Sequence, residues 1–525
     1  MKGLFAKFAT VGGATMASRL LGFVRDALIG RALGTGPFAE AFVVAFALPN
    51  LFRRIFAEGA FNTAFVPLFA KKLEGEDISL SRVFAEQVVS VLVPVLIVLS
   101  ALAIVAMPVI IFLTNPFWLF VDGTFVEAPP KFDYAVVYGR IMFPYLFCMS
   151  LVAMLSGVLN SLRRYFIAAF VPVLLNIILV ATVATALFLG IDQYSTGLWL
   201  SWGVFVAGFV QLLLLVWATR REGYAIWPKR PVFNEDIRKL LRLMGPAVLT
   251  GGVIQINLVV GQIIASAQDG ARALLYYADR LNQLPLGLIG IAVGIVLLPE
   301  LSRALKAERV EEAANLQDRS LEFAFGLTLP AAVAFITMPV ALVSIVFEGG
   351  AFTRGSSITV AHALAAFASG LPAYVLIKVF QPAFFAREDM RTPFRFSVVM
   401  VVVNVVGSII LFPLLGHIGI ALATSLSAWV NLGLLVFTLN RRGEFQPSRE
   451  TKRRLVIITV SSAAMGAAIL VLQNWLSASV FSFDIFERLV AVGAIVAVAA
   501  GLYAILVLAT GAVDRRQLLA MMRRG

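Results

Sequence analysis

The sequence has very few residues of the kinds that build metal centres and disulfides. Its 525 residues include one cysteine, Cys148, and two histidines, His362 and His417. A single cysteine excludes an intrachain disulfide, and these three residues do not make a zinc or haem pattern. The sequence also lacks a phosphate-binding loop and a nucleophile motif, so we expect neither an enzyme nor a bound cofactor.

Charged residues are scarce as well. They make up 14% of the chain against 60% hydrophobic residues, whereas soluble domains carry roughly 25%. No soluble block separates the apolar runs, so the composition predicts an all-α polytopic membrane protein. The net charge of +13 then predicts basic cytoplasmic loops rather than a nucleic-acid partner. The basic, mildly apolar N-terminus lacks a clean cleavage signature and predicts a retained first helix.

Apolar runs of about 20 residues predict fourteen transmembrane helices. The expected ranges are 8–32, 38–70, 84–113, 134–160, 166–190, 198–219, 243–267, 273–302, 320–346, 358–385, 394–415, 418–439, 454–476 and 488–510. Every second junction between them is basic, for example at Arg163 and Arg164, and the intervening junctions are poor in base. This alternation predicts that both termini are cytoplasmic.

The chain also repeats itself. Arg163 and Asn176 recur as Arg391 and Asn404, both shifted by 228 positions. We therefore expect two six-helix lobes related by a pseudo-two-fold axis along the membrane normal, an arrangement in which substrate binds between the lobes. The expected domains are 1–222 (N-lobe), 223–445 (C-lobe) and 446–525 (two extra C-terminal helices and a basic tail).

Charges inside the predicted helices are the candidates for function, because a charge at bilayer depth costs at least about 2.5 kcal/mol. The basic ones are Arg19, Arg25, Arg53, Arg54, Arg280 and Lys378, and the acidic ones are Asp26, Glu40, Glu58 and Asp279. An excess of arginine over acid favours an anion, since the guanidinium matches phosphate and carboxylate. Snorkelling to the interface or internal pairing is the structural alternative for each arginine.

Several other polar residues have two readings. The intramembrane amides, Asn257 and Asn404 among them, are either ligands of a coupling cation or hydrogen-bond partners between helices. Glu58, beside a glycine, is either part of a gate or a structurally satisfied carboxylate, and Lys378 is either a cavity residue or half of a structural pair. The basic, aromatic segment 221–242 predicts contact with anionic lipid.

Four segments carry a resemblance to a known family. They are ASRLLGFVRDALI, AFVVAFALPNLFRRIFAEGAFNTAFVPLFA, YYADRLNQLPLGLIGIAVGIVLLPELS and KVFQPAFFAREDMRTP. The chain resembles the MurJ (MviN) family, the lipid II flippases of the multidrug/oligosaccharidyl-lipid/polysaccharide exporter superfamily, over essentially its whole length. The resemblance implies a fourteen-helix inner-membrane protein whose two extra helices form a groove for the undecaprenyl tail.

The resemblance also assigns roles to residues. The family's cavity arginines match Arg19, Arg25, Arg53 and Arg280, which are expected to bind substrate, with Asp26 and Asp279 beside them. Glu40, Arg54, Glu58 and Lys378 join those two acids as gate or charge-partner candidates. Where some members have sodium-binding acids, this chain has only Asn257 and Asn404, so the driving force, Na⁺, H⁺ or membrane potential, stays open.

The function expected is translocation of lipid II to the periplasmic leaflet by a monomer surrounded by membrane lipids, with the cell-wall synthesis machinery as a candidate partner. The alternatives are a flippase for another polyprenyl-pyrophosphate-linked glycan, a cation-coupled drug exporter, or a non-transport cell-wall scaffold. A drug exporter would favour acids in the cavity, and a scaffold would tolerate Arg→Ala substitutions.

Overall fold

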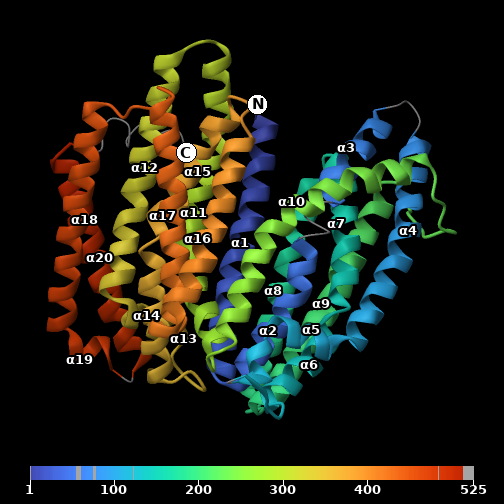
Figure 1. Ribbon diagram of the computed structural model, residues 1–525, viewed down its shortest axis with the longest axis horizontal. Helices are drawn as coiled ribbons and strands as arrows, with labels where there is room; N and C mark the ends of the chain where they lie inside the picture. Colours follow the sequence, from blue (N-terminus) through green and yellow to red (C-terminus); the bar gives the residue numbers. More distant parts are fainter. Residues whose placement is uncertain (1, 55–60, 75–77, 122, 483, 512–525) are drawn as a thin grey trace. The chain divides into compact units, whose positions relative to one another are not determined.

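The computed structural model describes residues 2–54, 61–74, 78–121, 123–482 and 484–511. Contacts between residues divide the chain into two units, which are described separately. Unit 1 comprises Met1–Ala273 with Gly349–Phe352, and unit 2 comprises Leu274–Glu348 with Thr353–Gly525. Each unit is a helical bundle (Figure 1).

Unit 1 is built almost entirely from helices. Its helices are α1 (Lys2–Leu33), α2 (Pro37–Phe52), α3 (Asn62–Leu73), α4 (Ile78–Val105), α5 (Met107–Thr114), α6 (Pro130–Met142), α7 (Tyr145–Ser161), α8 (Tyr165–Phe188), α9 (Gln193–Arg221) and α10 (Glu235–Ala265). A 3₁₀ turn, η2 (Pro116–Trp118), leads into a hairpin of β1 (Phe120–Val121) and β2 (Thr124–Phe125), in which Phe120 lies opposite Phe125. Helix α1 packs against α8, and α2 against α6.

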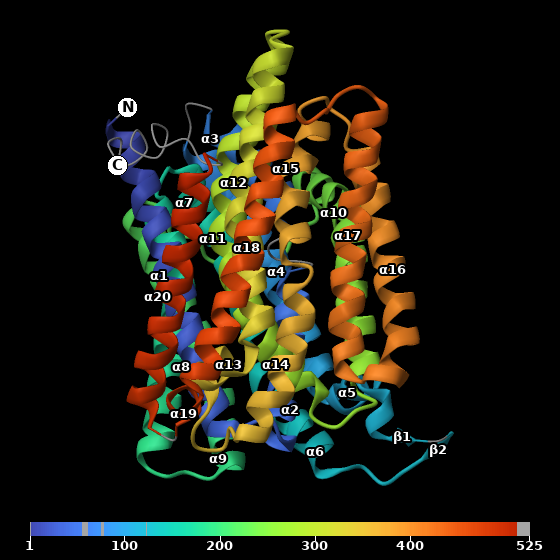
Figure 2. The ribbon, with the colours of Figure 1, turned by 90° about the vertical axis from the view of Figure 1, so that its left-hand side faces the viewer.

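Unit 2 continues from α11, whose first three residues belong to unit 1. Its helices are α11 (Ala271–Lys306), α12 (Val310–Thr337), α13 (Pro339–Phe347), α14 (Arg354–Ala368), α15 (Leu371–Phe385), α16 (Arg391–Leu415), α17 (His417–Arg441), α18 (Arg449–Trp475), α19 (Ser477–Val480) and α20 (Ile485–Ala509). Helices α16 and α17 lie side by side in both ribbon views (Figure 2). Leu321, Phe380 and Leu435 join α12, α15 and α17 in one hydrophobic core.

Within the described residues all fourteen predicted ranges are helical, and four of them are divided into two helices. The divided ranges are 84–113, 134–160, 320–346 and 358–385; in the range 38–70, residues 55–60 lie outside the described part of the chain. Proline explains several of these breaks, because it stands in the first turn of α5, α13 and α15, where its missing N–H costs no helical hydrogen bond. Elsewhere polar caps begin the helices: Asp192 accepts from the Ser195 N–H at 3.0 Å at the start of α9.

Ten helical segments within the described part of the chain are long and apolar enough to cross a membrane. They correspond to every predicted range except 8–32, 38–70, 243–267 and 273–302. Three of these four carry the intramembrane arginines. The chain is thus an all-helical, multi-pass membrane protein; the count of fourteen spans, the lobe boundaries and the two-fold symmetry stay predictions.

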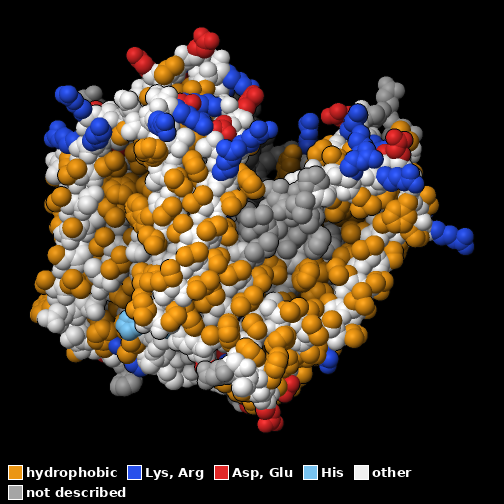
Figure 3. Space-filling view, in the orientation of Figure 1, with side chains coloured by type: hydrophobic (Ala, Val, Ile, Leu, Met, Phe, Trp, Pro, Cys, Tyr) orange, Lys and Arg blue, Asp and Glu red, His pale blue; other side chains and the backbone are white. Residues whose placement is uncertain are grey.

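The surface of each unit suits a bilayer (Figure 3). Hydrophobic side chains cover the length of the helices on the face shown. In unit 2, charged side chains of both signs gather at the end of the bundle where α12 and α18 begin, and in unit 1 they gather where α4 begins and α9 ends. This separation of apolar belt and charged ends is the pattern that a hydrocarbon core with polar margins selects.

Candidate functional site

The most buried of the predicted arginines is Arg25 on α1, with 7% of its surface exposed. Its Nε and Nη2 atoms donate to Oδ1 of Asp26 at 2.8 and 2.7 Å, and Nη1 donates to Oδ1 of Asn176 on α8 at 2.8 Å. Asp26 is 1% exposed. Burying a charge is costly unless it is paired and hydrogen-bonded, and this arrangement meets both conditions, so the Arg25 charge is held in one place.

Asn176 connects two helices rather than serving Arg25 alone. Its Nδ2 atom donates to the backbone oxygen of Ser18 at 2.8 Å, which ties α8 to α1 about two turns before Arg25. Asn176 is therefore a hydrogen-bond partner between helices rather than a cation ligand.

A path across α2 links Arg25 to Arg53. The Arg25 guanidinium carbon lies 5.7 Å from the centre of the Phe46 ring, within reach of a cation–π contact. The Phe46 backbone oxygen accepts from Asn50 Nδ2 at 2.8 Å, and Asn50 Oδ1 accepts from Arg53 Nε at 3.4 Å. We call these residues the unit 1 arginine cluster: Arg25, Asp26, Phe46, Asn50, Arg53 and Asn176.

The neighbouring charges leave this region positive. Arg19 and Arg54 are exposed, and Arg53 is half-buried. Glu58 lies outside the described residues. Among the described charges that the sequence singled out in residues 8–54, four arginines accompany two acids, Asp26 and Glu40, and Glu40 pairs with Lys131.

In unit 2 the candidate pair lies on α11. Asp279 and Arg280 are both half-buried; Gln283 donates to Asp279, and the Arg280 guanidinium lies 4.6 Å from the centre of the Tyr276 ring. Lys378 on α15 is half-buried between the buried Ile377 and Val379. Asp279, Arg280 and Lys378 all belong to unit 2, and only their contacts within that unit are described.

The weak cation-site candidates, Asn257 and Asn404, lie on two different helices. Asn257 is half-buried on α10, and Asn404 on α16 is 7% exposed and accepts from Thr424 Oγ1 of α17 at 3.1 Å. Over the described ranges, no group of three or more His, Cys, Asp or Glu side chains is arranged to hold a metal ion.

Glu40 has a partner that the sequence reasoning missed. Lys131, in the first turn of α6, donates to Glu40 at 3.0 Å and to Asp269 at 2.5 Å, and its Nζ atom lies 4.9 Å from the centre of the Trp118 ring. Glu40 is 1% exposed. Lys131 and Glu40 are 91 positions apart, so no local sequence pattern predicts their contact. The available signal was that Lys131 is a lysine in a junction otherwise poor in basic residues.

A second unanticipated feature is a backbone interlock within unit 1, formed by the turns 31–36 and 349–352. The Ala351 N–H donates to the Arg31 oxygen at 2.8 Å. Gly34 has φ +69° and Gly350 has φ +56°, and a Cβ atom added to either would lie 2.6 or 2.5 Å from a facing backbone oxygen. Only glycine fits both the positive φ and the close approach.

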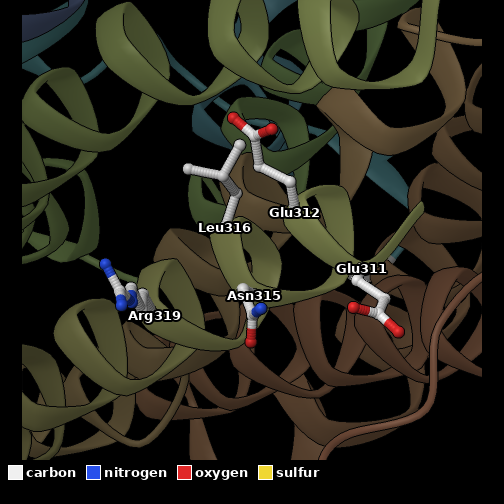
Figure 4. Close-up of a pocket in the computed structure, with 5 residues that line it drawn as sticks. All are labelled: Glu311, Glu312, Asn315, Leu316 and Arg319. Carbon is white, nitrogen blue, oxygen red and sulfur yellow. The ribbon is translucent and has the colours of Figure 1, made fainter. Parts of the chain in front are cut away.

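Helix α12 begins beside a hollow of about 440 Å³, lined by Glu311, Glu312, Asn315, Leu316 and Arg319. Figure 4 shows both glutamates and Arg319 rising from this helix. No predicted site residue lines the hollow, so it is separate from the arginines described above.

Comparison with known proteins places the chain in a family. Residues 29–491 match the family model described as "Lipid II flippase MurJ". A probable lipid II flippase MurJ of Rhizobium tropici is 46% identical over 97% of this chain and 95% of its own length. Another, from Rhizobium meliloti (strain 1021), is 49% identical over 90% of this chain and 88% of its own length.

Solved structures agree in fold. A lipid II flippase MurJ in an inward closed conformation superposes with a TM-score of 0.77 at 23% identity, covering 94% of this chain and 97% of that one. An inward-facing multidrug resistance MATE family transporter of the MOP superfamily gives 0.65 at 15% identity, covering 84% and 95%. At these identities the likeness concerns the fold; the sequence matches carry the family, and the chain belongs to the lipid II flippase MurJ family.

Proposed function

We propose that this protein is a flippase that moves lipid II from the cytoplasmic to the periplasmic leaflet of the bacterial inner membrane. Membership in the family and the names of its relatives support the substrate, an undecaprenyl pyrophosphate carrying a disaccharide-pentapeptide. The protein is a transporter rather than an enzyme, works as a monomer, and has both termini in the cytoplasm. The cell-wall synthesis machinery is its candidate protein partner.

The observation that carries this proposal is the buried, fixed charge of Arg25 in a region where arginine exceeds acid. A pyrophosphate and the peptide carboxylates carry the negative charge that an arginine-rich region attracts. Guanidinium groups bind such oxygens through two parallel hydrogen bonds, and these bonds strengthen where water is excluded.

The residues divide the work according to their burial. Arg19 and Arg53, more accessible than Arg25, make first contact with the headgroup, and Arg280 on α11 contributes from the second lobe. Asp26 and Asp279 keep neighbouring charge balanced when no cargo is bound. The lobes then rock about the substrate in alternating access, the mechanism typical of two-lobed transporters.

Closure of the periplasmic side involves Glu40 and the interlocked turns. Lys131 holds Glu40 and Asp269 together, and opening toward the periplasm releases the Asp269 contact first, because that carboxylate is almost fully exposed. Arg54, Glu58 and Lys378 are the remaining gate or charge-partner candidates. The movement is driven by Na⁺, H⁺ or the membrane potential, with Asn257 and Asn404 as the candidates for a cation.

Headgroup exposure in cells tests the proposal. The resident flippase is depleted, this protein is supplied, and the lipid II accessible to a probe confined to the periplasm is measured. The variants Arg25→Ala, Arg53→Ala and Arg280→Ala are compared at matched membrane levels. Arg441→Ala, which removes an exposed arginine at the end of α17, is the matched control.

We expect the native protein and Arg441→Ala to restore exposure, and the variants at Arg25, Arg53 and Arg280 to lose it. If all three variants still restore exposure, the protein transports lipid II but these arginines are not needed to bind the headgroup, which would contradict the proposed site. No exposure from a well-expressed native protein would contradict lipid II as cargo and favour another polyprenyl-linked glycan or the scaffold.

A further inference from the structure

The segment 222–234, which joins α9 to α10, is fastened to the side of α4; we call it the strap. Within unit 1 it loops along the outer side of α4 (Figure 1). Tyr224 and Ser81 share a hydrogen bond of 2.9 Å between their hydroxyl groups, and Asn234 donates to Gln87 at 2.8 Å. Both ends of the strap are therefore fixed to the same helix.

Lys229 fastens the middle of the strap. Its backbone N–H donates to Ser90 Oγ at 2.7 Å and its Nζ to Glu86 at 2.5 Å. Glu86 is 5% exposed, and it also pairs with Arg82 at 3.2 Å. A buried carboxylate needs such partners, so Glu86 explains why the strap runs where it does.

Because of these bonds, the strap lies beside the part of α4 that is apolar enough to span the membrane. Ser90 lies within the apolar segment Ser79–Val105, about 16 Å along the helix axis from Ser79 at 1.5 Å per residue. A segment bonded at that position lies at the depth of the membrane margin rather than out in the aqueous phase. The outer side of the strap therefore faces the bilayer rather than the aqueous phase, where a soluble protein could bind it.

The outer side of the strap combines large apolar groups with positive charge. Trp227, Val232 and Phe233 are each more than half exposed, and Arg230 is exposed beside them. The Arg220 guanidinium stacks 4.3 Å from the centre of the Trp227 ring. Figure 3 shows a basic side chain standing out from this edge of unit 1 beside hydrophobic ones.

We propose that the strap is a binding site for the headgroups of anionic phospholipids, of the phosphatidylglycerol type, in the leaflet that faces it. Trp227 and Phe233 enter the headgroup–acyl boundary, where amphipathic rings are favoured. Arg220 and Arg230 bind the lipid phosphate, since basic groups near an anionic membrane surface are attracted to it. The site is separate from the arginines proposed to bind cargo, and it anchors α4 to the membrane surface.

The test measures which lipid touches Trp227. Full-length protein is reconstituted in equal mixtures of phosphatidylglycerol and phosphatidylcholine, in which one or the other lipid carries brominated acyl chains that quench tryptophan. The contribution of Trp227 is the difference between the native protein and Trp227→Phe. The comparison is repeated with Arg220→Gln/Arg230→Gln, and with Arg441→Gln as the matched control.

We expect brominated phosphatidylglycerol to quench Trp227 at least about twofold more than brominated phosphatidylcholine, from the charge–lipid attraction of two arginines. The preference should vanish in the double variant, persist in Arg441→Gln, and fall toward unity in the native protein as salt is raised. Equal quenching by both lipids would overturn headgroup selection. An absence of quenching by either lipid would overturn membrane contact and favour a protein partner.

Discussion

At the scale of single residues, the pair of Arg25 and Asp26 makes the strongest prediction. Removing one member of a buried ion pair leaves the other charge uncompensated, at a cost of about 3–5 kcal/mol, whereas replacing both is often nearly neutral. Asp26→Asn should therefore lower the free energy of unfolding by about 3 kcal/mol. Arg25→Gln/Asp26→Asn should recover most of that loss and still fail to transport.

Thermal unfolding of the purified variants in detergent, together with the cellular exposure assay, checks both parts. Glu74→Gln, which alters an exposed carboxylate at the end of α3, is the control and should unfold like the native protein. An Asp26→Asn variant as stable as the native protein would show that the pair does not compensate a buried charge.

Asp389, in the loop between α15 and α16, makes a prediction about pH. Partial burial raises the pKa of Asp389, but hydrogen bonds from Thr392 and the ion pair with Arg442 outweigh this and hold the pKa at about 2. An ordinary aspartate has a pKa of about 3.9. The folded state therefore gains stability from ionised Asp389 above about pH 4 and loses it as the pH falls toward 2.

Asp389→Asn cannot lose an ionised carboxylate at low pH. The melting temperature of this variant should therefore fall less between about pH 4 and pH 2 than that of the native protein. The effect should stay below about 1 kcal/mol, because the pair is partly exposed. Glu388→Gln, the neighbouring exposed carboxylate, should keep the native profile. A native slope in Asp389→Asn would contradict the assignment.

Adjacency decided which of these residues could be predicted. Arg25 and Asp26 are neighbours in the sequence, so their pairing was visible in it. Glu40 and Lys131 are 91 positions apart, and their contact depends on α2 packing against α6. Lys131 looked like an ordinary loop charge because a sequence does not show which charged side chains packing will bury.

At the scale of elements, the interlocked turns predict different effects for substitutions at two glycines of the same turn. Gly34 has φ +69° and faces the Ala351 oxygen, whereas Gly36 has φ −81° and nothing within 4 Å of an added Cβ. Gly34→Ala should lower the melting temperature and Gly36→Ala should not, since only the first combines a left-handed backbone with a steric conflict. Thermal unfolding of both variants measures the difference; equal effects would contradict the interlock.

Glu348 fastens α20 to the rest of unit 2. It accepts from Arg488 of α20 at 2.8 Å and from Arg354 and Ser357 of α14 at 3.1 and 3.0 Å. Glu348→Gln should loosen α20, because Arg488 is 5% exposed and would lose its charged partner. Faster proteolysis or amide exchange in residues 485–509 would show it; unchanged exchange there would contradict the role.

Helix ranges were predictable because about 20 apolar residues are required to cross a bilayer and nothing else in the chain resembles that pattern. The division of four predicted helices into two was not predicted, although prolines at the start of α5, α13 and α15 were visible in the sequence. A proline permits either a kink or a fresh helical start, and packing against neighbours such as α9 or α17 selects between the two.

At the scale of the whole molecule, the ten described segments that are long and apolar enough to cross a membrane contain none of the intramembrane arginines. Those arginines lie in predicted helices 1, 2 and 8, of which 2 and 8 are equivalent under the predicted repeat. The sequence alone predicted this gathering of charge, since apolar runs and charge are local properties. It did not supply the packing within each unit, which depends on contacts between distant segments.

The most direct test of the central claim uses purified protein in proteoliposomes with fluorescent lipid II on one leaflet. Movement is measured as the fraction of headgroup that becomes accessible to an impermeant quencher on the other side. The account predicts movement with the native protein and with Arg441→Ala, and loss of movement with Arg25→Ala, Arg53→Ala and Arg280→Ala. Undiminished movement in all three variants would contradict an arginine-based path for the headgroup.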